Sequence, residues 1–245
     1  MLDFHSHIIP GIDDGSKDTS MSLAMLELSR KQGVDYICAT PHFYADMTSP
    51  DRFLHKRDAA YNALIDAMEV HGGFDAYPRI FKGAEVHYFR GMSACEDISR
   101  LCLQGTKLIL IEMPFHEWTD YMIRDVAELT SAGLMPVAAH IERYLSIQSN
   151  AKIEDFLDTG ILIQCNAEFF LTPSTKKKAL RLLSENMIDF LGSDAHNLRS
   201  RVPNLGPAVS LIEKKLGSEA LSKIQRNNKL LIEAWKIVAA RGGAA

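Results

Sequence analysis

The chain has 245 residues, and its 27 Lys and Arg residues against 31 Asp and Glu residues give a formal net charge of −4. A hydrophobic fraction of 47% supports a full core and excludes fibrous, collagen-like and disordered proteins. The acidic balance argues against a general nucleic-acid or membrane-surface binder, which would carry a basic surface. One domain is expected at this length, over residues 1–240, with residues 241–245 as a loose tail.

Targeting and cysteine signals are weak. The first residues are too polar for a signal peptide, and no apolar run approaches the roughly 18–20 residues of a membrane helix, so a cytoplasmic protein is expected. The four cysteines form no C-x-x-C pair and are expected to be reduced core residues. They are Cys38, Cys95, Cys102 and Cys165.

Short apolar runs alternate with helical patterns along the chain. The runs that predict strands are residues 2–4, 36–39, 79–85, 108–111, 136–139, 161–166 and 188–191. Helices are predicted around residues 21–28, 60–67, 122–129 and 174–186 and through most of the chain after residue 197. In the first of them, Met21, Ala24, Met25 and Leu28 recur at i, i+3, i+4 and i+7, which is one face of a helix.

These repeated strand–helix units predict a parallel sheet. The strands are uniformly apolar, as expected when both faces of a sheet are covered. No linker or clear repeat divides the chain, and no G-x-G-x-x-G or Walker loop indicates a nucleotide site. A closed or nearly closed α/β barrel of seven (β/α) units fits better than an open, doubly wound sheet.

Residues of the types that bind metal ions stand where strand after strand ends. The carboxyl ends of barrel strands converge on one face, so these residues should meet in one pocket. Including a carboxylate from the first loop, they are His5, His7, Asp14, His42, Glu85, Glu112, His140, Asp194 and His196. Imidazoles mixed with carboxylates suit Mn²⁺, Fe or Zn²⁺ rather than Ca²⁺. Asp13 is an alternative to Asp14, because only one of two adjacent residues points inward easily.

Several motifs carry a family resemblance. They are residues 5–15 (HSHIIPGIDDG), 39–42 (ATPH), 83–86 (GAEV), 110–114 (LIEMP), 139–143 (AHIER) and 193–197 (SDAHN). This ordered set resembles the PHP (polymerase and histidinol phosphatase) superfamily. Within it, the set is similar to the bacterial manganese-dependent protein-tyrosine phosphatases of capsule and exopolysaccharide operons. The match runs to about residue 240.

The resemblance implies a distorted (β/α)₇ PHP barrel with two or three divalent ions, Mn²⁺ first, with Fe or Zn²⁺ as alternatives. It places one ion among His5, His7, Glu85 and Asp194. Glu85 would bridge to a second ion. The other ligands of the second ion would be Glu112 and His140, and those of a third would be Asp14, His42 and His196.

The resemblance also assigns phosphate binding to Arg143 and Arg201, with Arg199 as a neighbouring alternative to the latter. Guanidinium groups match phosphate oxygens in bidentate fashion. The expected reaction is hydrolysis of protein phosphotyrosine by a metal-activated hydroxide. The expected substrate is the tail of a bacterial tyrosine kinase that regulates capsule synthesis. A histidinol-phosphatase-like small-molecule phosphatase and a non-catalytic regulatory module are the alternatives. The oligomeric state stays open.

Cysteine-dependent tyrosine phosphatases require an Arg six positions after the nucleophilic Cys. The residues at those positions here are Tyr44, Leu101, Leu108 and Leu171, which excludes that chemistry. Aromatic residues also follow two of the predicted ligands and form either a wall for the phosphotyrosine ring or plain loop packing. They are Phe43, Tyr44, Phe115, His116 and Trp118.

Overall fold

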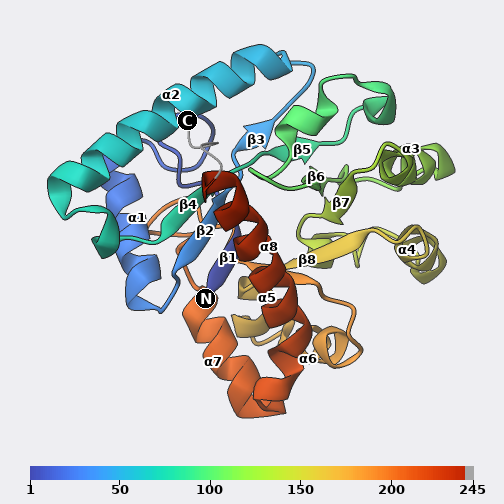
Figure 1. Cartoon of the computed structure of the whole chain (residues 1–245). Helices are drawn as coiled ribbons and strands as arrows, with labels where there is room; N and C mark the ends of the chain where they lie inside the picture. Colours follow the sequence, from blue (N-terminus) through green and yellow to red (C-terminus); the bar gives the residue numbers. More distant parts are fainter. Residues whose placement is uncertain (241–245) are drawn as a thin grey trace.

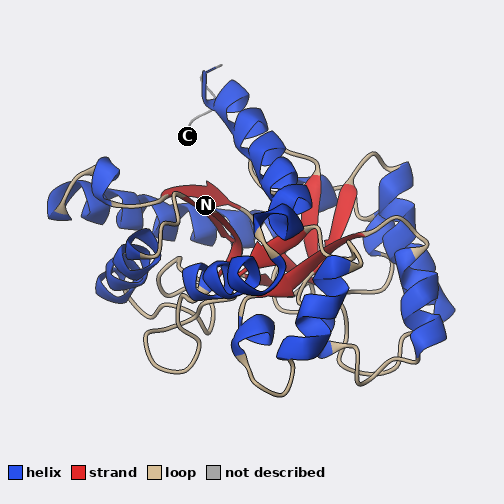
Figure 2. Cartoon of the chain, turned by 90° about the horizontal axis from the view of Figure 1, so that it is seen from below, coloured by secondary structure: helices blue, strands red, loops and turns tan. Residues whose placement is uncertain are grey.

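The strands form a curled, entirely parallel sheet surrounded by helices (Figures 1 and 2). The computed structural model describes residues 1–240, so the predicted tail lies outside the described residues. The strands are β1 (Leu2–Ser6), β2 (Tyr36–Ala39), β3 (His42–Phe43), β4 (Arg79–Lys82), β5 (Glu85–His87), β6 (Leu108–Glu112), β7 (Met135–Ala138), β8 (Leu162–Asn166) and β9 (Phe190–Gly192). The helices are α1 (Thr19–Lys31), α2 (Pro50–His71), α3 (Asp120–Ser131), α4 (Asn150–Leu157), α5 (Glu168–Leu171), α6 (Lys176–Ser184), α7 (Leu205–Leu216) and α8 (Ser222–Ala240).

The predicted run 79–85 is interrupted and supplies β4 and the start of β5, whereas β3 follows β2 after a similar break and lies beyond the predicted run 36–39. The sheet orders are β1-β2-β4 and β3-β5-β6-β7-β8-β9, and the two breaks lie where one sheet passes into the other. At the other seam β1 meets β9 through a bridge between Ser6 and Ala195. The predicted distorted (β/α)₇ architecture is therefore confirmed, with all strand pairs parallel.

Apolar side chains fill the interior that the strands enclose. Phe4 of β1 stacks on Phe190 of β9 with ring centroids 4.0 Å apart. The other buried members of this cluster are Leu2, Cys38, Phe81, Leu103, Leu108, Leu110, Val137, Ala139 and Leu231. Leu231 belongs to α8, which crosses the amino-terminal ends of the strands (Figure 1). This helix closes one end of the interior and leaves the carboxyl ends for the polar residues.

Every second side chain of a strand points into the interior of the barrel, and this row of side chains continues to the polar end of the strand. Leu108 and Leu110 of β6 point inward, so Glu112 continues the same row. His5 and His140 are out of phase with their interior neighbours Phe4 and Ala139. A register shift in β1 between Asp3 and Ser6 and a left-handed residue after β7 accompany the two exceptions.

Helix α1 is present as predicted, but its buried face differs from the apolar face identified in the sequence. The buried residues are Ser22, Leu23, Met25, Leu26 and Ser29, so Met25 alone is shared with that face. The two serines are buried because their hydroxyls have local acceptors: Ser22 donates to Ser16 Oγ, and Ser29 donates to the Met25 carbonyl. A periodicity that counts only apolar residues therefore misplaces the face.

Two other helices differ from the prediction. Helix α2 begins ten residues earlier than the predicted range, at Pro50, where Ser49 caps it by accepting the Arg52 N–H. Helix α4 lies in a stretch for which no element was predicted. Within residues 1–240, no helix has the length and apolar character needed to cross a membrane.

The position of Leu231 predicts a stability effect. Leu231 is 3% exposed and belongs to the interior cluster, whereas its neighbour Leu230 is 60% exposed. We expect Leu231→Ala to lower the free energy of unfolding by about 2–4 kcal/mol because it leaves a cavity. Leu230→Ala should change it by less than about 0.5 kcal/mol. Urea unfolding followed by circular dichroism measures both, and equal effects would contradict the role of α8.

Candidate metal centre

His5 and His7 stand at the end of β1 with their Nε2 atoms 3.1 Å apart. Both side chains are buried. His7 Nδ1 lies 2.7 Å from Asp13 Oδ2, and His5 Nδ1 lies 3.2 Å from the side-chain oxygen of Gln164. An imidazole whose Nδ1–H donates to an oxygen presents an unprotonated Nε2, which is the form that binds a metal ion.

The carboxylate of Glu85 lies at the centre of the cluster. Its Oε2 is 3.2 Å from Nε2 of both His5 and His7 and 3.0 Å from Nδ1 of His42. Its Oε1 is 2.8 Å from His140 Nε2. A carboxylate that is 1% exposed is costly unless cations or hydrogen-bond donors surround it. Protonated His7 and His140 meet that requirement in the absence of metal ions, and metal ions held by the imidazoles would meet it otherwise.

The adjacent Asp13 and Asp14 have different places in the first loop. Asp14 Oδ1 lies 3.5 Å from His42 Nε2 and 3.3 Å from His196 Nε2, at the exposed rim of the cluster. Asp13 lies behind His7 and accepts the backbone N–H groups of Gly15 and His42. Asp14 therefore faces the cluster, and Asp13 orients His7.

Several sets of atoms in the described residues are close enough to hold an ion, with all ligand atoms of a set within 4.8 Å of one another. The sets are His7, Asp14, His42 and His196; His5, His7 and Glu85; and His42, Glu85 and Glu112. Atoms that share one ion at about 2.1 Å lie at most about 4.2 Å apart, so small adjustments suffice. The third set joins Glu85 and Glu112 with His42, whereas the resemblance joins these two carboxylates with His140. His140 Nε2 is nevertheless 3.5 Å from Glu112 Oε1.

Two of the residues have strained backbones. His140 has φ 33° and Asp194 has φ 52°, in the left-handed region that non-glycine residues seldom adopt. Hydrogen bonds from both backbone N–H groups hold these conformations: His140 donates to Gln164 at 2.7 Å, and Asp194 donates to the His5 carbonyl at 2.8 Å. Such strain persists where the surroundings enforce it, and it commonly marks functional sites.

Close backbone packing also shapes the centre. A Cβ atom on Gly192 would lie 2.6 Å from the Cβ of His5, and one on Gly15 would lie 2.3 Å from the carbonyl oxygen of His7. Both contacts are shorter than real side chains tolerate. Glycine at these positions therefore lets β9 and the first loop approach the two histidines.

Sequence reasoning missed three polar residues at this edge. Gln164 and Asn166 end β8, the strand without a predicted ligand. Gln164 contacts His5 and the His140 backbone, and its amide donates to Asn166, which donates to Asp194 at 2.9 Å. His87 Nδ1 lies 3.0 Å from Glu112 Oε2. The available signal was their spacing, since Gln164/Asn166 and Glu85/His87 repeat the i, i+2 pattern of His5/His7.

Arg143 and Arg201 both contact the carboxylate of Asp194. Arg201 Nη2 donates to Asp194 at 2.7 Å, and Arg143 makes an ion pair with the same carboxylate. The two arginine side chains are 34% and 35% exposed, so both remain accessible to an anion. They line a cavity of about 250 Å³ beside the cluster. Arg199 is exposed and makes no ion pair with the cluster in the described residues.

The aromatic residues divide between the two expected roles. Tyr44 lies 5.3 Å from the His42 ring, and the half-exposed Phe115 stacks 6.0 Å from the His140 ring, so both border the centre. Phe43 and Trp118 are buried packing residues. His116 is exposed and contacts the Glu117 carbonyl.

All four cysteines are free, and Cys38, Cys102 and Cys165 are buried. Burial raises the pKa of the Cys102 thiol to about 11 and raises those of Cys38 and Cys165 well above their ordinary value. These three thiols are poor nucleophiles at neutral pH. Their burial agrees with the absence of the cysteine phosphatase motif.

Unsatisfied polar atoms show that this donor set fits metal ions. Of the seven buried side-chain N or O atoms without a hydrogen-bond partner in residues 1–240, four belong to predicted ligands. They are His42 Nδ1, Glu85 Oε2, His140 Nδ1 and His196 Nε2. Buried polar atoms are nearly always paired, and divalent ions would satisfy those of His42, Glu85 and His196, whereas His140 faces the cluster with its Nε2 instead.

Residues 1–233 match the family model described as capsular polysaccharide synthesis, CpsB/CapC. The chain belongs to the CpsB/CapC family. It is 32% identical to the tyrosine-protein phosphatase CpsB of Streptococcus agalactiae, over 95% of this chain and 96% of that protein. It is 30% identical to the tyrosine-protein phosphatase YwqE of Bacillus subtilis, over 95% and 91% of the two chains.

Solved structures agree with this CpsB/CapC membership. The fold matches a chain from the structures of B. subtilis YwqE and Streptococcus pneumoniae CpsB, described as unique metal-dependent tyrosine phosphatases, with a TM-score of 0.80. Identity there is 28%, and the match covers 96% and 95% of the two chains. A histidinol phosphate phosphatase from Lactococcus lactis has a TM-score of 0.51 at 15% identity, over 87% and 92% of the chains. That second likeness concerns the fold alone.

The pKa values in the centre without metal ions follow from burial and from neighbouring charge. Burial opposes protonation of His140, but its hydrogen bonds to Glu112 and Glu85 raise its pKa to about 9. The pKa of His7 is raised well above its usual value by Asp13, Asp194 and Glu85, which outweigh burial. Burial and the charge of His7 instead lower the pKa of His196 to about 4.

These shifts predict how pH affects the protein without metal ions. A histidine whose pKa is raised by folding adds to the stability of the folded state. This contribution is complete at pH values below about 6.5, the pKa of histidine in the unfolded chain, and it is lost as the pH rises through about 9, the pKa of His140 in the folded protein. Metal ions replace the protons and bind more tightly as pH rises. We therefore expect the chelator-treated protein to lose several degrees of melting temperature between pH 6.5 and 9.

The same measurement with Mn²⁺ supplies the comparison. The difference in melting temperature between the Mn²⁺-loaded and chelator-treated protein should grow over this pH range, which differential scanning calorimetry measures directly. A chelator-treated protein that becomes more stable from pH 6.5 to 9 would contradict the assignment.

Proposed function

We propose that this protein is a metal-dependent phosphatase that hydrolyses phosphotyrosine on protein. The observation that carries the proposal is the imidazole and carboxylate cluster around Glu85, with two half-exposed arginines beside it. Metal ions and guanidinium groups are the two cationic groups best suited to a phosphate ester. The names of the similar CpsB and YwqE proteins support the same chemistry.

We assign the ligands to three ions, with residues 1–240 as the catalytic domain. One ion would lie among His5, His7, Glu85 and Asp194, a second among Glu85, Glu112 and His140, and a third among Asp14, His42 and His196. The mixture of nitrogen and oxygen donors favours Mn²⁺, with Fe or Zn²⁺ as alternatives. Ions so held would lower the pKa of bound water toward 7 and would supply hydroxide at neutral pH.

The side chains around the cluster have separate tasks. Arg143 and Arg201 hold the phosphate oxygens and neutralise the charge that develops on them. Tyr44 and Phe115 border the space for the tyrosine ring. The phenolate leaving group has a conjugate acid with a pKa of about 10, so it needs less protonation than the alkoxide of serine would.

The substrate that fits best is the phosphorylated tail of a bacterial tyrosine kinase that regulates capsule or exopolysaccharide synthesis, in the cytoplasm. The family description, capsular polysaccharide synthesis, supports the process. The name tyrosine-protein phosphatase, which the similar CpsB and YwqE proteins carry, supports the type of substrate.

The proposal is tested by kinetics with matched variants. Mn²⁺-loaded protein should hydrolyse a phosphotyrosine peptide, and chelator should abolish turnover. We expect Glu85→Gln to lower kcat/KM at least about 100-fold through loss of metal binding. Arg201→Ala should lower it about 100-fold or more through loss of phosphate contacts. Arg199→Ala is the matched control and should leave it nearly unchanged.

The outcomes separate the alternative activities. A higher kcat/KM for histidinol phosphate than for phosphotyrosine peptides would favour a small-molecule phosphatase. Absence of turnover with every phosphate ester, in protein with measured metal content, would favour a regulatory module.

A further inference from the structure

A second cavity borders the cluster at Asp14 and His42. Its volume is about 860 Å³, and it runs between the first loop and the amino-terminal half of α2. Asp14, His42 and Tyr44 line its inner end. The outer wall is a basic face of α2, formed by Arg52, His55 and Lys56. The cavity therefore continues directly from the candidate metal centre to this face, which we call the α2 basic face.

The α2 basic face has no carboxylate partners in the described residues. The acidic residues of the same half of the helix are engaged elsewhere. Asp51 pairs with Arg100 at 2.6 Å, and Asp58 pairs with Arg57 at 2.9 Å. Arg52 and His55 are exposed and make no ion pair among residues 1–240. The positive charge of this wall is therefore available to a ligand.

The position of Arg52 has no stabilising explanation within the helix. It lies in the first turn of α2, where the helix dipole disfavours a cation. Lys56 has a different role, because its Nζ donates to the carbonyl of Ile12 at 2.9 Å and ties α2 to the loop that carries Asp13 and Asp14. The wall is thus fixed relative to the cluster while Arg52 and His55 stay free.

We propose that the α2 basic face binds an anionic side chain next to the phosphotyrosine of the substrate. This inference rests on the proposed function and adds a sequence preference to it. Phosphotyrosine at the metal centre would place the neighbouring residues of the peptide in the cavity, which Met47 and Phe53 also line. The α2 basic face would then attract a negative charge on the peptide. The anion is either the carboxylate of an acidic residue or the phosphate of a second phosphotyrosine.

The test compares three peptides that differ only beside the phosphotyrosine, with flanking Asp, Asn or a second phosphotyrosine. Binding of peptides that carry a non-hydrolysable phosphonate in place of the phosphate is measured by fluorescence anisotropy, and kcat/KM is measured with the phosphopeptides, both with the Mn²⁺-loaded protein. We expect the anionic peptides to be favoured about fivefold over the Asn peptide at low salt, mainly through Kd and KM. The preference should decline as salt is added.

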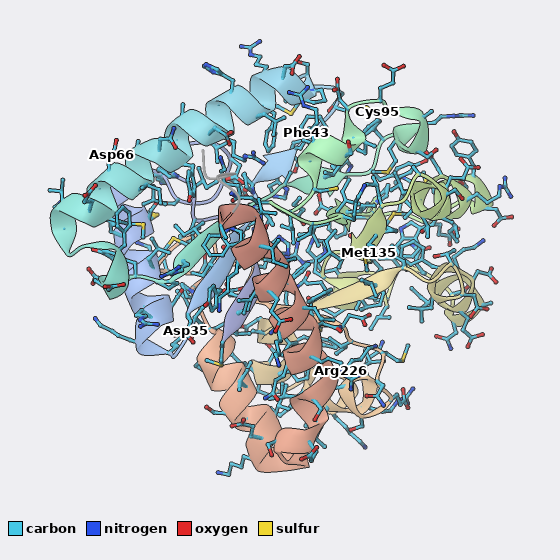
Figure 3. The ribbon with its side chains drawn as sticks, viewed as in Figure 1. Asp35, Phe43, Asp66, Cys95, Met135 and Arg226 are labelled. Carbon is cyan, nitrogen blue, oxygen red and sulfur yellow. The ribbon has the colours of Figure 1, made fainter. Side chains whose placement is uncertain are left out.

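Charge reversal on α2 provides the decisive variant. Arg52→Glu should reverse the preference, and the helix should tolerate it because an acidic residue suits the first turn. Arg226→Glu is the matched control, since Arg226 is an exposed arginine on α8 at the other end of the barrel (Figure 3). It should leave the preference and the turnover of free phosphotyrosine unchanged.

The two proposals fail in different ways. Equal binding of the three peptides, or an unchanged preference in Arg52→Glu, overturns the role of the α2 basic face even if all peptides are hydrolysed. Preference for the Asp peptide alone assigns the anion to a carboxylate, and preference for the doubly phosphorylated peptide alone assigns it to a phosphate. Charge-dependent binding without any turnover supports the face and contradicts the phosphatase function.

Discussion

The contacts between the buried carboxylate of Glu85 and the surrounding imidazoles organise the functional end of the barrel. The carboxylate contacts imidazoles from β1, β3 and the end of β7, and it is almost without solvent exposure. A charge in this position is stable only when cations or metal ions surround it. Protons on His7 and His140 provide that compensation in the absence of metal ions.

The barrel supplies the geometry that this charge requires. An apolar interior closed by α8 at one end fixes the direction of each strand, and the alternation of side chains brings Glu112 to the other end. Where alternation alone would point a side chain away, the backbone departs from regular strand geometry, as the register shift before His5 and the left-handed His140 show. Regular packing therefore positions part of the site, and local strain positions the rest.

Much of this arrangement could be predicted from residue types and spacing. The strand runs and the convergence of their ends were predictable because parallel sheets need long apolar strands and because histidines at strand ends are conspicuous. Gln164 and Asn166 escaped prediction because amides occur in many structural roles and only the contacts with His5 and Asp194 reveal theirs. The buried face of α1 differs from the apolar face seen in the sequence because Ser22 and Ser29 are buried with their hydroxyl groups bonded locally. Hydrophobic periodicity does not detect such residues.

The seam between β1 and β9 has a consequence for the synthesis of the protein. Asp194 donates its N–H to the carbonyl of His5, so the first and last strands of the chain are neighbours in the finished centre. A ribosome-bound chain that ends before residue 194 has His5 and His7 but lacks Asp194, His196 and Arg201. Such a chain therefore lacks part of the proposed ligand set and one of the two proposed phosphate-binding arginines. The full set can assemble only after β9 has been synthesised and has docked against β1.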